Sequence, residues 1–309
     1  MLSLFKKTKD QSSRAGLHLG TNGVACAIVK RRSGGRPLLE YCAFYPSSTA
    51  EEALAMLPTV LGPPEFKRVA FSAVARSDDY QLVQIEAPEV QPAELRAAVR
   101  WPLRDVINFN VDDAVVDVFE IPDQSRRSRG KMMFAVAAKS SAIQDLVRAV
   151  SPLAPRLDVI DIPELCLRNI GALLPQDHKG LALLSLGPTA AQLILIRQGV
   201  IYLTRRVEYD SHDGNDSGPV MDPARLALEL QRSLDYYESH YDHPAIGDLV
   251  LMSDDARASR LAVALTNETS LQIDVLDLTG ALELAAAIDP QTAAPCLLAI
   301  GAALRSDAA

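Results

Sequence analysis

Short apolar stretches separated by turn-forming residues predict β-strands near the start of the chain. Residues 15–44 contain three such stretches, with glycine turns between them. Apolar runs of this length bounded by glycine are typical of strands that pair through hairpins. A helix is predicted over Ser48–Leu61, with Thr49 or the preceding serine as its N-cap. The apolar segment Phe66–Ala75 predicts a further strand.

The same order of elements recurs in the second half of the chain. Residues 181–207 again contain an apolar stretch, a glycine turn, a second apolar stretch, a short glycine turn and a third stretch. Aligning the two segments places Gly187 on Gly20 and Pro188-Thr189 on Thr21-Asn22. We interpret this as an internal duplication, which constrains the architecture of the whole chain. It predicts an α/β protein with two lobes and a cleft between them.

A block of different pattern, residues 78–154, separates the two repeats. Its periodicity predicts a helix, two strands and a second helix, over residues 91–102, 114–121, 132–138 and 142–150. The hairpin tip between the two strands carries four basic residues: Arg126, Arg127, Arg129 and Lys131. We expect a solvated hairpin there, and contact with an acidic partner or lipid is the alternative. The block as a whole is interpreted as an inserted subdomain.

The strongest helix pattern follows the second repeat, with Asp222 as N-cap and Pro223 as its first residue. Further on, the pattern predicts a strand, a helix, a strand and a closing helix, over residues 249–252, 257–265, 271–275 and 295–305. The predicted domains are a basic lead at 1–14, a first lobe at 15–77, the insertion at 78–154 and a second lobe at 155–309. The closing helix is expected to pack back on the first lobe.

Composition supports a soluble globular protein and weakens other classes. The chain has 309 residues, 48% of them hydrophobic and 23% charged, which fits about two ordinary domains. A net charge of −8 and an aromatic content of 5% argue against a generic nucleic-acid binder. No apolar run is long enough to span a bilayer, and no secretory signal precedes the four cysteines. We therefore expect reduced thiols and a cytoplasmic protein, with a frayed lead or, alternatively, a weak membrane contact there.

The chemistry that the sequence offers centres on its glycine turns. No nucleophile or metal-ligand motif stands out. A tight turn between strands presents backbone N–H groups that can hold a phosphate. Two such turns, one from each lobe, could hold the phosphates of a nucleotide from opposite sides.

A family resemblance rests on several segments taken in order. They are MLSLFKK before GLHLGTNGVACAIV, then AELRAAVRWPLRDVINFNVDDAVVDVFEIP, RLALELQRSLDYYES and CLLAIGAALRS. The chain resembles the actin-like ATPase superfamily over residues 17–306, and within it the PilM/MshI family of type IV pilus assembly proteins. The resemblance implies a duplicated, ribonuclease H-like two-lobe fold with the inserted subdomain that PilM shares with FtsA.

The resemblance also implies a nucleotide cleft, which this sequence would carry in degenerate form. His18 and Ser185 stand where the family places aspartates, and Ser253-Asp254 stands where it places paired glycines. Carboxylates are the ligands that hydrated Mg²⁺ requires. The residues of this predicted cleft are His18, Gly20, Thr21, Asn22, Ser185, Gly187, Thr189, Glu229, Arg232, Ser233, Ser253 and Asp254.

Within that cleft, Glu229, Arg232 and Ser233 resemble the helix that reaches adenosine in the superfamily. The alternative is that Glu229 and Arg232 form an ordinary ion pair on the surface of a helix. We expect no catalysis, no bound metal and no Mg-ATP cofactor, and residual nucleotide binding stays open.

By resemblance, the expected function is that of an adaptor at the inner membrane. It would bind the cytoplasmic N-terminal peptide of a single-span partner, a protein like PilN or MshJ, in a groove near Phe71, Leu95, Val99 and Trp101. Trp101, the only tryptophan, would anchor the peptide if exposed and fill the core if buried. The alternatives are an active ATPase or kinase, and the cytoplasmic part of a type II secretion platform protein. Such platform proteins usually continue into a transmembrane helix.

Overall fold

The structure is a computed structural model that describes residues 13–122, 130–154, 156–187, 190–208, 222–253 and 256–306. The described chain divides into two compact units. The first contains the chain up to Val74, Ala149–Asp161 and the chain from Asp277 onward. The second contains Ala75–Arg148 and Ile162–Leu276. The basic lead to residue 12 and the arginines at the predicted hairpin tip lie outside the described residues.

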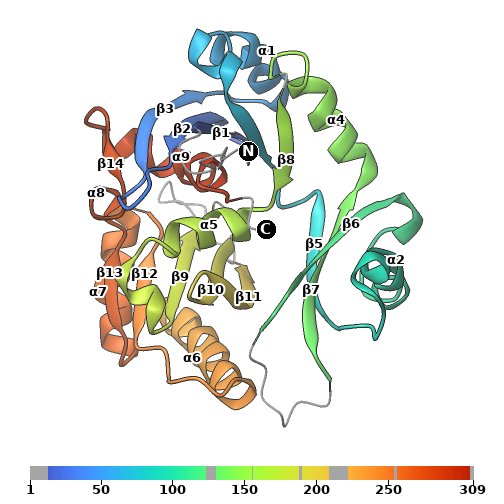
Figure 1. Ribbon diagram of the computed structural model, residues 1–309. Coiled ribbons are helices and arrows are strands. Elements are labelled where there is room, and N and C mark those ends of the chain that lie inside the picture. The colour runs from blue at the N-terminus through green and yellow to red at the C-terminus, as the bar shows by residue number, and fades with distance from the viewer. Residues whose placement is uncertain are drawn as a thin grey trace, which may run out of the picture. The chain divides into compact units, whose positions relative to one another are not determined.

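A six-stranded sheet forms the centre of the first unit, with the order β14-β3-β2-β1-β4-β8 (Figure 1). Its strands are β1 Ser13–Gly20, β2 Gly23–Lys30, β3 Leu38–Pro46, β4 Ala70–Val74, β8 Leu157–Asp161 and β14 Glu283–Leu284. The first three strands pair antiparallel, as predicted, and β4 and β8 continue the sheet in parallel. The predicted strand over 66–75 begins only at Ala70, because Pro64–Arg68 forms a 3₁₀ turn that buries Phe66.

Two longer helices belong to this unit, together with the short α8 Leu278–Ala281. In α1 Ala50–Val60, Thr49 caps the backbone of Glu52 and the Glu52 carboxylate accepts from the backbone N–H of Thr49 in return. This confirms the predicted cap. Helix α9 Pro290–Ala303 packs against β1, β2 and β3. A Cβ on Gly16 of β1 would lie 1.8 Å from the carbonyl oxygen of Ala299, so the helix and the strand pack backbone against backbone.

A five-stranded sheet in the second unit repeats this topology, with the order β11-β10-β9-β12-β13. Its strands are β9 Leu181–Leu186, β10 Ala190–Arg197, β11 Val200–Glu208, β12 Asp248–Leu251 and β13 Gln272–Val275. An antiparallel meander is again followed by two parallel strands. The duplication predicted from the glycine turns is therefore visible in the topology. The helices around this sheet are α5 Pro163–Gly171, α6 Pro223–His240 and α7 Ala256–Glu268, with a 3₁₀ turn at Pro175–His178.

The inserted block contains a three-stranded antiparallel sheet with the order β5-β7-β6. The strands are β5 Tyr80–Glu86, β6 Ala114–Glu120 and β7 Met132–Lys139, and α4 Ser140–Val150 follows. Strand β5 was not predicted. The helix predicted over 91–102 is broken into a 3₁₀ turn at Pro92–Glu94, α2 Leu95–Ala98 and α3 Arg100–Leu103, and a further 3₁₀ turn spans Val111–Asp113. These short helices cover one face of the sheet through a core that includes Val99 and Leu103.

Two features differ from the predicted domain boundaries. Strand β8 pairs with β4, so residues 157–161 extend the first sheet rather than the second lobe. The phenol of Tyr80 on β5 donates a 2.5 Å hydrogen bond to the buried carboxylate of Glu164 on α5. The inserted sheet therefore belongs to the second unit, within which it contacts α5. No helix among the described residues is long and apolar enough to cross a membrane.

Candidate functional site

The first predicted phosphate turn joins β1 to β2. Gly20 pairs with Gly23 in the register of the two strands, so Thr21 and Asn22 form a tight and exposed two-residue turn. Gly23 has a φ of 152°, and a Cβ there would lie 2.3 Å from the carbonyl oxygen of Tyr45. Glycine is therefore required at this position for the turn to close. His18 lies partly buried two residues before Gly20, at the end of β1.

The second predicted turn has the equivalent place in the second sheet, between β9 and β10. Gly187 donates its backbone N–H to the carbonyl oxygen of Ala190 over 2.9 Å, which closes the hairpin. Ser185 lies partly buried near the end of β9. Thr189, also predicted in this site, lies outside the described residues. Each sheet thus presents a glycine turn at the end of its first strand, as the duplication implies.

Ser253 lies at the same edge of the second sheet as Ser185. The parallel register pairs Leu251 of β12 with Leu184 of β9, and the N–H of Met252 donates to the carbonyl oxygen of Leu184 over 2.8 Å. Ser253 follows directly and is buried. The structure therefore brings together Ser185 and Ser253 at the carboxyl ends of neighbouring strands. Asp254 lies outside the described residues.

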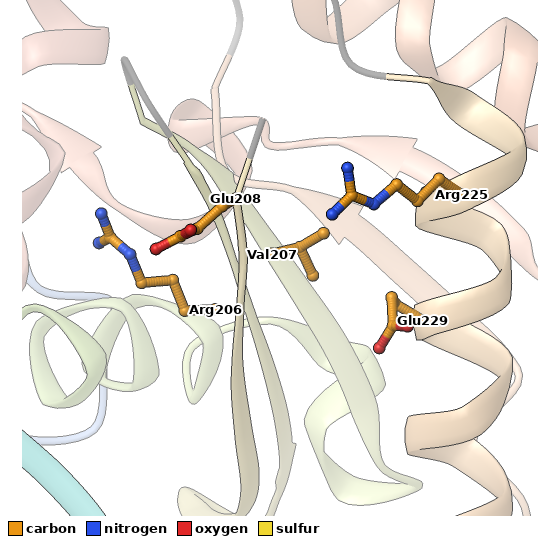
Figure 2. Close-up of a pocket in the computed structure, with 5 residues that line it drawn as sticks. All are labelled: Arg206, Val207, Glu208, Arg225 and Glu229. Carbon is orange, nitrogen blue, oxygen red and sulfur yellow. The ribbon is translucent and has the colours of Figure 1, made fainter. Parts of the chain in front are cut away.

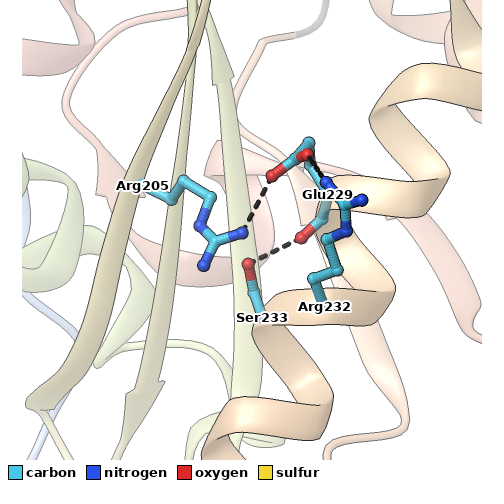
Figure 3. Close-up of polar contacts among 4 residues, drawn as sticks. All are labelled: Arg205, Glu229, Arg232 and Ser233. Carbon is cyan, nitrogen blue, oxygen red and sulfur yellow. Dashed lines mark hydrogen bonds and ion pairs between the residues drawn. The ribbon is translucent and has the colours of Figure 1, made fainter.

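Glu229 on α6 is the centre of an ion-pair network (Figure 3). Its Oε2 accepts from Arg205 on β11 over 2.8 Å, and its Oε1 accepts from Arg232 over 2.6 Å. Ser233 donates its hydroxyl to the backbone carbonyl of Glu229 over 2.7 Å. Each carboxylate oxygen of Glu229 therefore already accepts a hydrogen bond from a guanidinium group. The hydrogen bond from Arg205 is the main cause that lowers the pKa of Glu229, and Arg232 adds to it.

Sequence reasoning predicted Glu229 and Arg232 but missed Arg205. The pair Glu229–Arg232 is visible as a spacing of three along a helix, which is a local signal. Arg205 comes from β11, more than twenty residues earlier, and no local pattern links it to α6. The observed network is more than the predicted ion pair on the surface of a helix, because Arg205 joins α6 to β11.

A pocket of about 300 Å³ lies beside this network (Figure 2). It is lined by residues of β11 and α6: Arg206, Val207, Glu208, Arg225 and Glu229. Val207 points toward Arg225 and Glu229 on α6, whereas Arg206 and Glu208 point to the other side of β11 (Figure 2). Four of the five lining residues are charged, two of each sign, so the pocket suits a polar ligand that both accepts and donates hydrogen bonds. Of the lining residues, only Glu229 was predicted from the sequence.

A different kind of surface lies on the inserted subdomain. Trp101 in α3 is 73% exposed, and the guanidinium carbon of Arg104 lies 5.1 Å from the centre of its ring. Val106, five residues along the chain, is 54% exposed. We call the exposed residues Trp101, Pro102 and 104–106 the Trp101 surface. The prediction that the Trp101 ring fills a core is wrong, and the exposed alternative is the one observed.

The other residues predicted to line a partner groove do not lie on this surface. Val99 and Phe71 are fully buried, and Leu95 packs against the core beneath α2. Val99 belongs to the core of the inserted sheet, whereas Phe71 lies on β4 in the first unit with its ring 5.8 Å from that of Phe66. Their apolar side chains stabilise the two cores, although the family resemblance had placed them in a groove. Trp101 is the predicted groove residue that is open to a partner.

Comparisons with known proteins add to this geometry. No family model matches the sequence, and no curated protein matches it. The fold is the actin-like ATPase fold, in which two sheets of the same topology carry the glycine turns described above. Among solved structures, the PilM–PilN type IV pilus biogenesis complex is similar with a TM-score of 0.69 at 19% identity, over 94% of this chain and 97% of that one.

Two further structures share the fold at lower similarity. One is a Bacteroides thetaiotaomicron protein of actin-like ATPase fold and unknown function, with a TM-score of 0.50 at 13% identity, over 95% of this chain and 100% of that one. The other is the cytoplasmic domain of EpsL, an inner membrane component of the type II secretion system of Vibrio cholerae. It has a TM-score of 0.50 at 12% identity, over 96% of each chain. These similarities establish the fold.

Proposed function

We propose that this protein is a PilM-like adaptor of a type IV pilus assembly platform. It is cytoplasmic, lies peripheral to the inner membrane, and binds the cytoplasmic N-terminal peptide of a single-span partner like PilN or MshJ. The observation that carries the proposal is the fold similarity to PilM in the PilM–PilN complex, which extends over nearly the whole of both chains. The exposed Trp101 supplies the anchor that such a peptide needs.

The Trp101 surface has the chemistry of a peptide-binding site. A tryptophan that is 73% exposed leaves apolar surface in contact with water, and a bound peptide would cover that surface. The Arg104 guanidinium lies over the ring and favours this orientation of the indole. A preoriented aromatic side chain loses little conformational entropy when a partner binds.

The same proposal includes the absence of ATP hydrolysis. His18 and Ser185 offer an imidazole and a neutral hydroxyl where the resemblance places the carboxylates that hold hydrated Mg²⁺. Glu229, the carboxylate nearest the pocket on α6, already accepts from two guanidinium groups. These residues do not fit Mg-ATP as a catalytic substrate, so the function is one of binding.

The type II secretion alternative has one observation in its favour, the similarity to the cytoplasmic domain of EpsL. Its TM-score of 0.50 is lower than the 0.69 found with PilM. The two functions differ in the expected partner, and only a PilM-like adaptor is expected to bind a peptide of a PilN-like protein. We therefore favour the pilus function.

Calorimetry with a synthetic peptide tests the proposal. The peptide is the cytoplasmic N-terminus of the PilN-like protein from the same organism. We expect saturable binding to the wild type and at least a tenfold weaker affinity for Trp101→Ala, since an anchoring aromatic contributes about 2 kcal/mol or more.

Val263→Ala is the matched control, because Val263 on α7 is 70% exposed and lies outside the Trp101 surface. It should bind like the wild type, and both variants should keep the wild-type melting temperature. No heat with the wild type, or equal binding by Trp101→Ala, would overturn the proposed function or its anchor.

A further inference from the structure

Three cysteines in the first unit have no part in the proposed function. Cys26 lies on β2, Cys42 on β3 and Cys296 on α9, and all three are free thiols. Helix α9 packs against the strands that carry the other two. Each sulfur can therefore be placed from the register of the sheet and from the path of the helix.

The register of the sheet places Cys42 under α9. Gly16 of β1 pairs with Ala27 of β2, and Ala27 pairs with Cys42 of β3, so the three form one row across the sheet. Laterally paired residues point to the same face. Since a Cβ on Gly16 would collide with the carbonyl oxygen of Ala299, α9 lies directly on this face. Small residues in the row allow that close approach.

Cys296 lies one helical turn before Ala299, on the side of α9 that meets the sheet. Helix α9 packs on β3, and the thiols of Cys296 and Cys42 lie near enough for each to shift the pKa of the other. Cys296 is fully buried, whereas Cys42 is partly exposed. The two side chains are thus neighbours, and Cys42 is the less buried residue of the pair.

The two thiols also differ in reactivity. The hydrogen bond from Cys296 lowers the pKa of Cys42, and the same bond together with burial raises the pKa of Cys296. The thiolate is the nucleophilic form of cysteine. Cys42 is therefore the thiol that reacts first with an oxidant, and Cys296 is placed to resolve the product.

We propose that Cys42 and Cys296 form a peroxide-responsive dithiol whose disulfide fastens α9 to β3. The Cys42 thiolate attacks one oxygen of hydrogen peroxide, the O–O bond breaks, and hydroxide leaves and takes up the thiol proton as water. Cys42 is then a sulfenic acid. The sulfur of Cys296 attacks the Cys42 sulfur, the S–O bond breaks, and a second water leaves with the Cys296 proton. Two thiols are oxidised to one disulfide, and one peroxide is reduced to two waters.

The other cysteines serve as internal controls. Cys26 pairs with Ala43, a neighbour of Cys42 on β3, so its side chain is on the opposite face of the sheet. Burial raises its pKa to about 12. Cys166 is buried on α5 in the other unit. Neither is placed to take the role of Cys42 or Cys296.

The test uses the folded full chain, treated with hydrogen peroxide, then unfolded and alkylated for mass spectrometry. We expect a loss of two of the four alkylatable thiols and a peptide cross-link between Cys42 and Cys296, both reversed by dithiothreitol. Cys42→Ala and Cys296→Ala should lose the cross-link, whereas Cys26→Ala and Cys166→Ala should keep it. A cross-link to Cys26, or loss of the Cys42 thiol while that of Cys296 stays free, would overturn the proposal.

Thermal unfolding of the wild type gives a second readout that needs no variant. A disulfide between β3 and α9 closes a long loop and restricts the unfolded chain. The oxidised protein should therefore melt at a higher temperature than the reduced protein, and dithiothreitol should restore the lower value. An unchanged melting temperature in fully cross-linked protein would contradict the proposed fastening of α9.

Discussion

At the residue scale, the candidate site depends on side chains whose partners lie far away in the sequence. The predicted pair Glu229–Arg232 is present, yet Arg205 from β11 takes the other carboxylate oxygen. Exposure was equally out of reach of local patterns, because Val99 and Trp101 are two residues apart and the first is buried while the second is 73% exposed. The candidate residues could be chosen from the sequence, whereas their burial and their distant partners could not be predicted from it.

The Glu229 network should contribute to stability in a pH-dependent way. Glu229→Gln removes the charge that both guanidinium groups bind, and we expect the free energy of unfolding to fall by about 1 kcal/mol at pH 7. Because the folded pKa lies below the ordinary glutamate value of 4.5, the contribution is fully present above that pH. It is lost as the pH falls through the lowered folded pKa.

Urea unfolding of the wild type and of Glu229→Gln between pH 3 and pH 7 checks this prediction. Arg232→Ala is the matched control, since its guanidinium is 59% exposed and should contribute only about 0.3 kcal/mol. A difference between wild type and Glu229→Gln that grows as the pH falls below 4.5 would contradict the assignment.

At the element scale, strands with strong apolar runs and glycine turns were predicted, and weakly patterned elements were missed. Strand β8 reads LDVID, a short segment with two aspartates and neither a long apolar run nor a strict alternation, so its pattern is weak. Helix α5 begins after Ile162, which offers no side-chain cap, so Pro163 at its first position is the remaining start signal. Both elements are fixed by tertiary contacts, the first by β4 and the second by β9, β10 and β11.

The packing of α9 on β1 depends on Gly16. In Gly16→Ala the new methyl group would overlap the backbone of Ala299, so the helix must move away from the sheet. We expect the free energy of unfolding to fall by about 3 kcal/mol. Gly247→Ala is the matched control, because a Cβ there meets nothing within 4 Å. Equal melting temperatures for the two variants would show that α9 does not pack as described.

At the scale of the whole molecule, the duplication was the most informative feature of the sequence. Aligning Gly20 with Gly187 predicted two related lobes, and the two sheets share one topology. The sequence alone did not reveal that the chain returns to the first sheet through β8 and β14. These short strands pair with segments more than eighty residues away, which a local pattern cannot encode. The fold class was therefore predictable, and the path of the chain was only partly so.

The adaptor account predicts no turnover of Mg-ATP. Phosphate release by the purified protein should not exceed that of a His18→Ala/Ser185→Ala double variant prepared in the same way. The physical reason is that neither His18 nor Ser185 offers a carboxylate for Mg²⁺. Calorimetry on the same samples separates binding from turnover. Release by the wild type that the double variant lacks would identify an enzyme and contradict the account.

The most direct measurement of the central claim is the fluorescence of the only tryptophan during titration with the partner peptide. Trp101 should emit in the free protein as a solvent-exposed indole that acrylamide quenches readily. Peptide binding at the Trp101 surface should shift the emission to shorter wavelength and protect it from acrylamide, with the midpoint that calorimetry gives. Calorimetric binding without any change in emission or quenching would show that the peptide binds elsewhere and would contradict the proposed site.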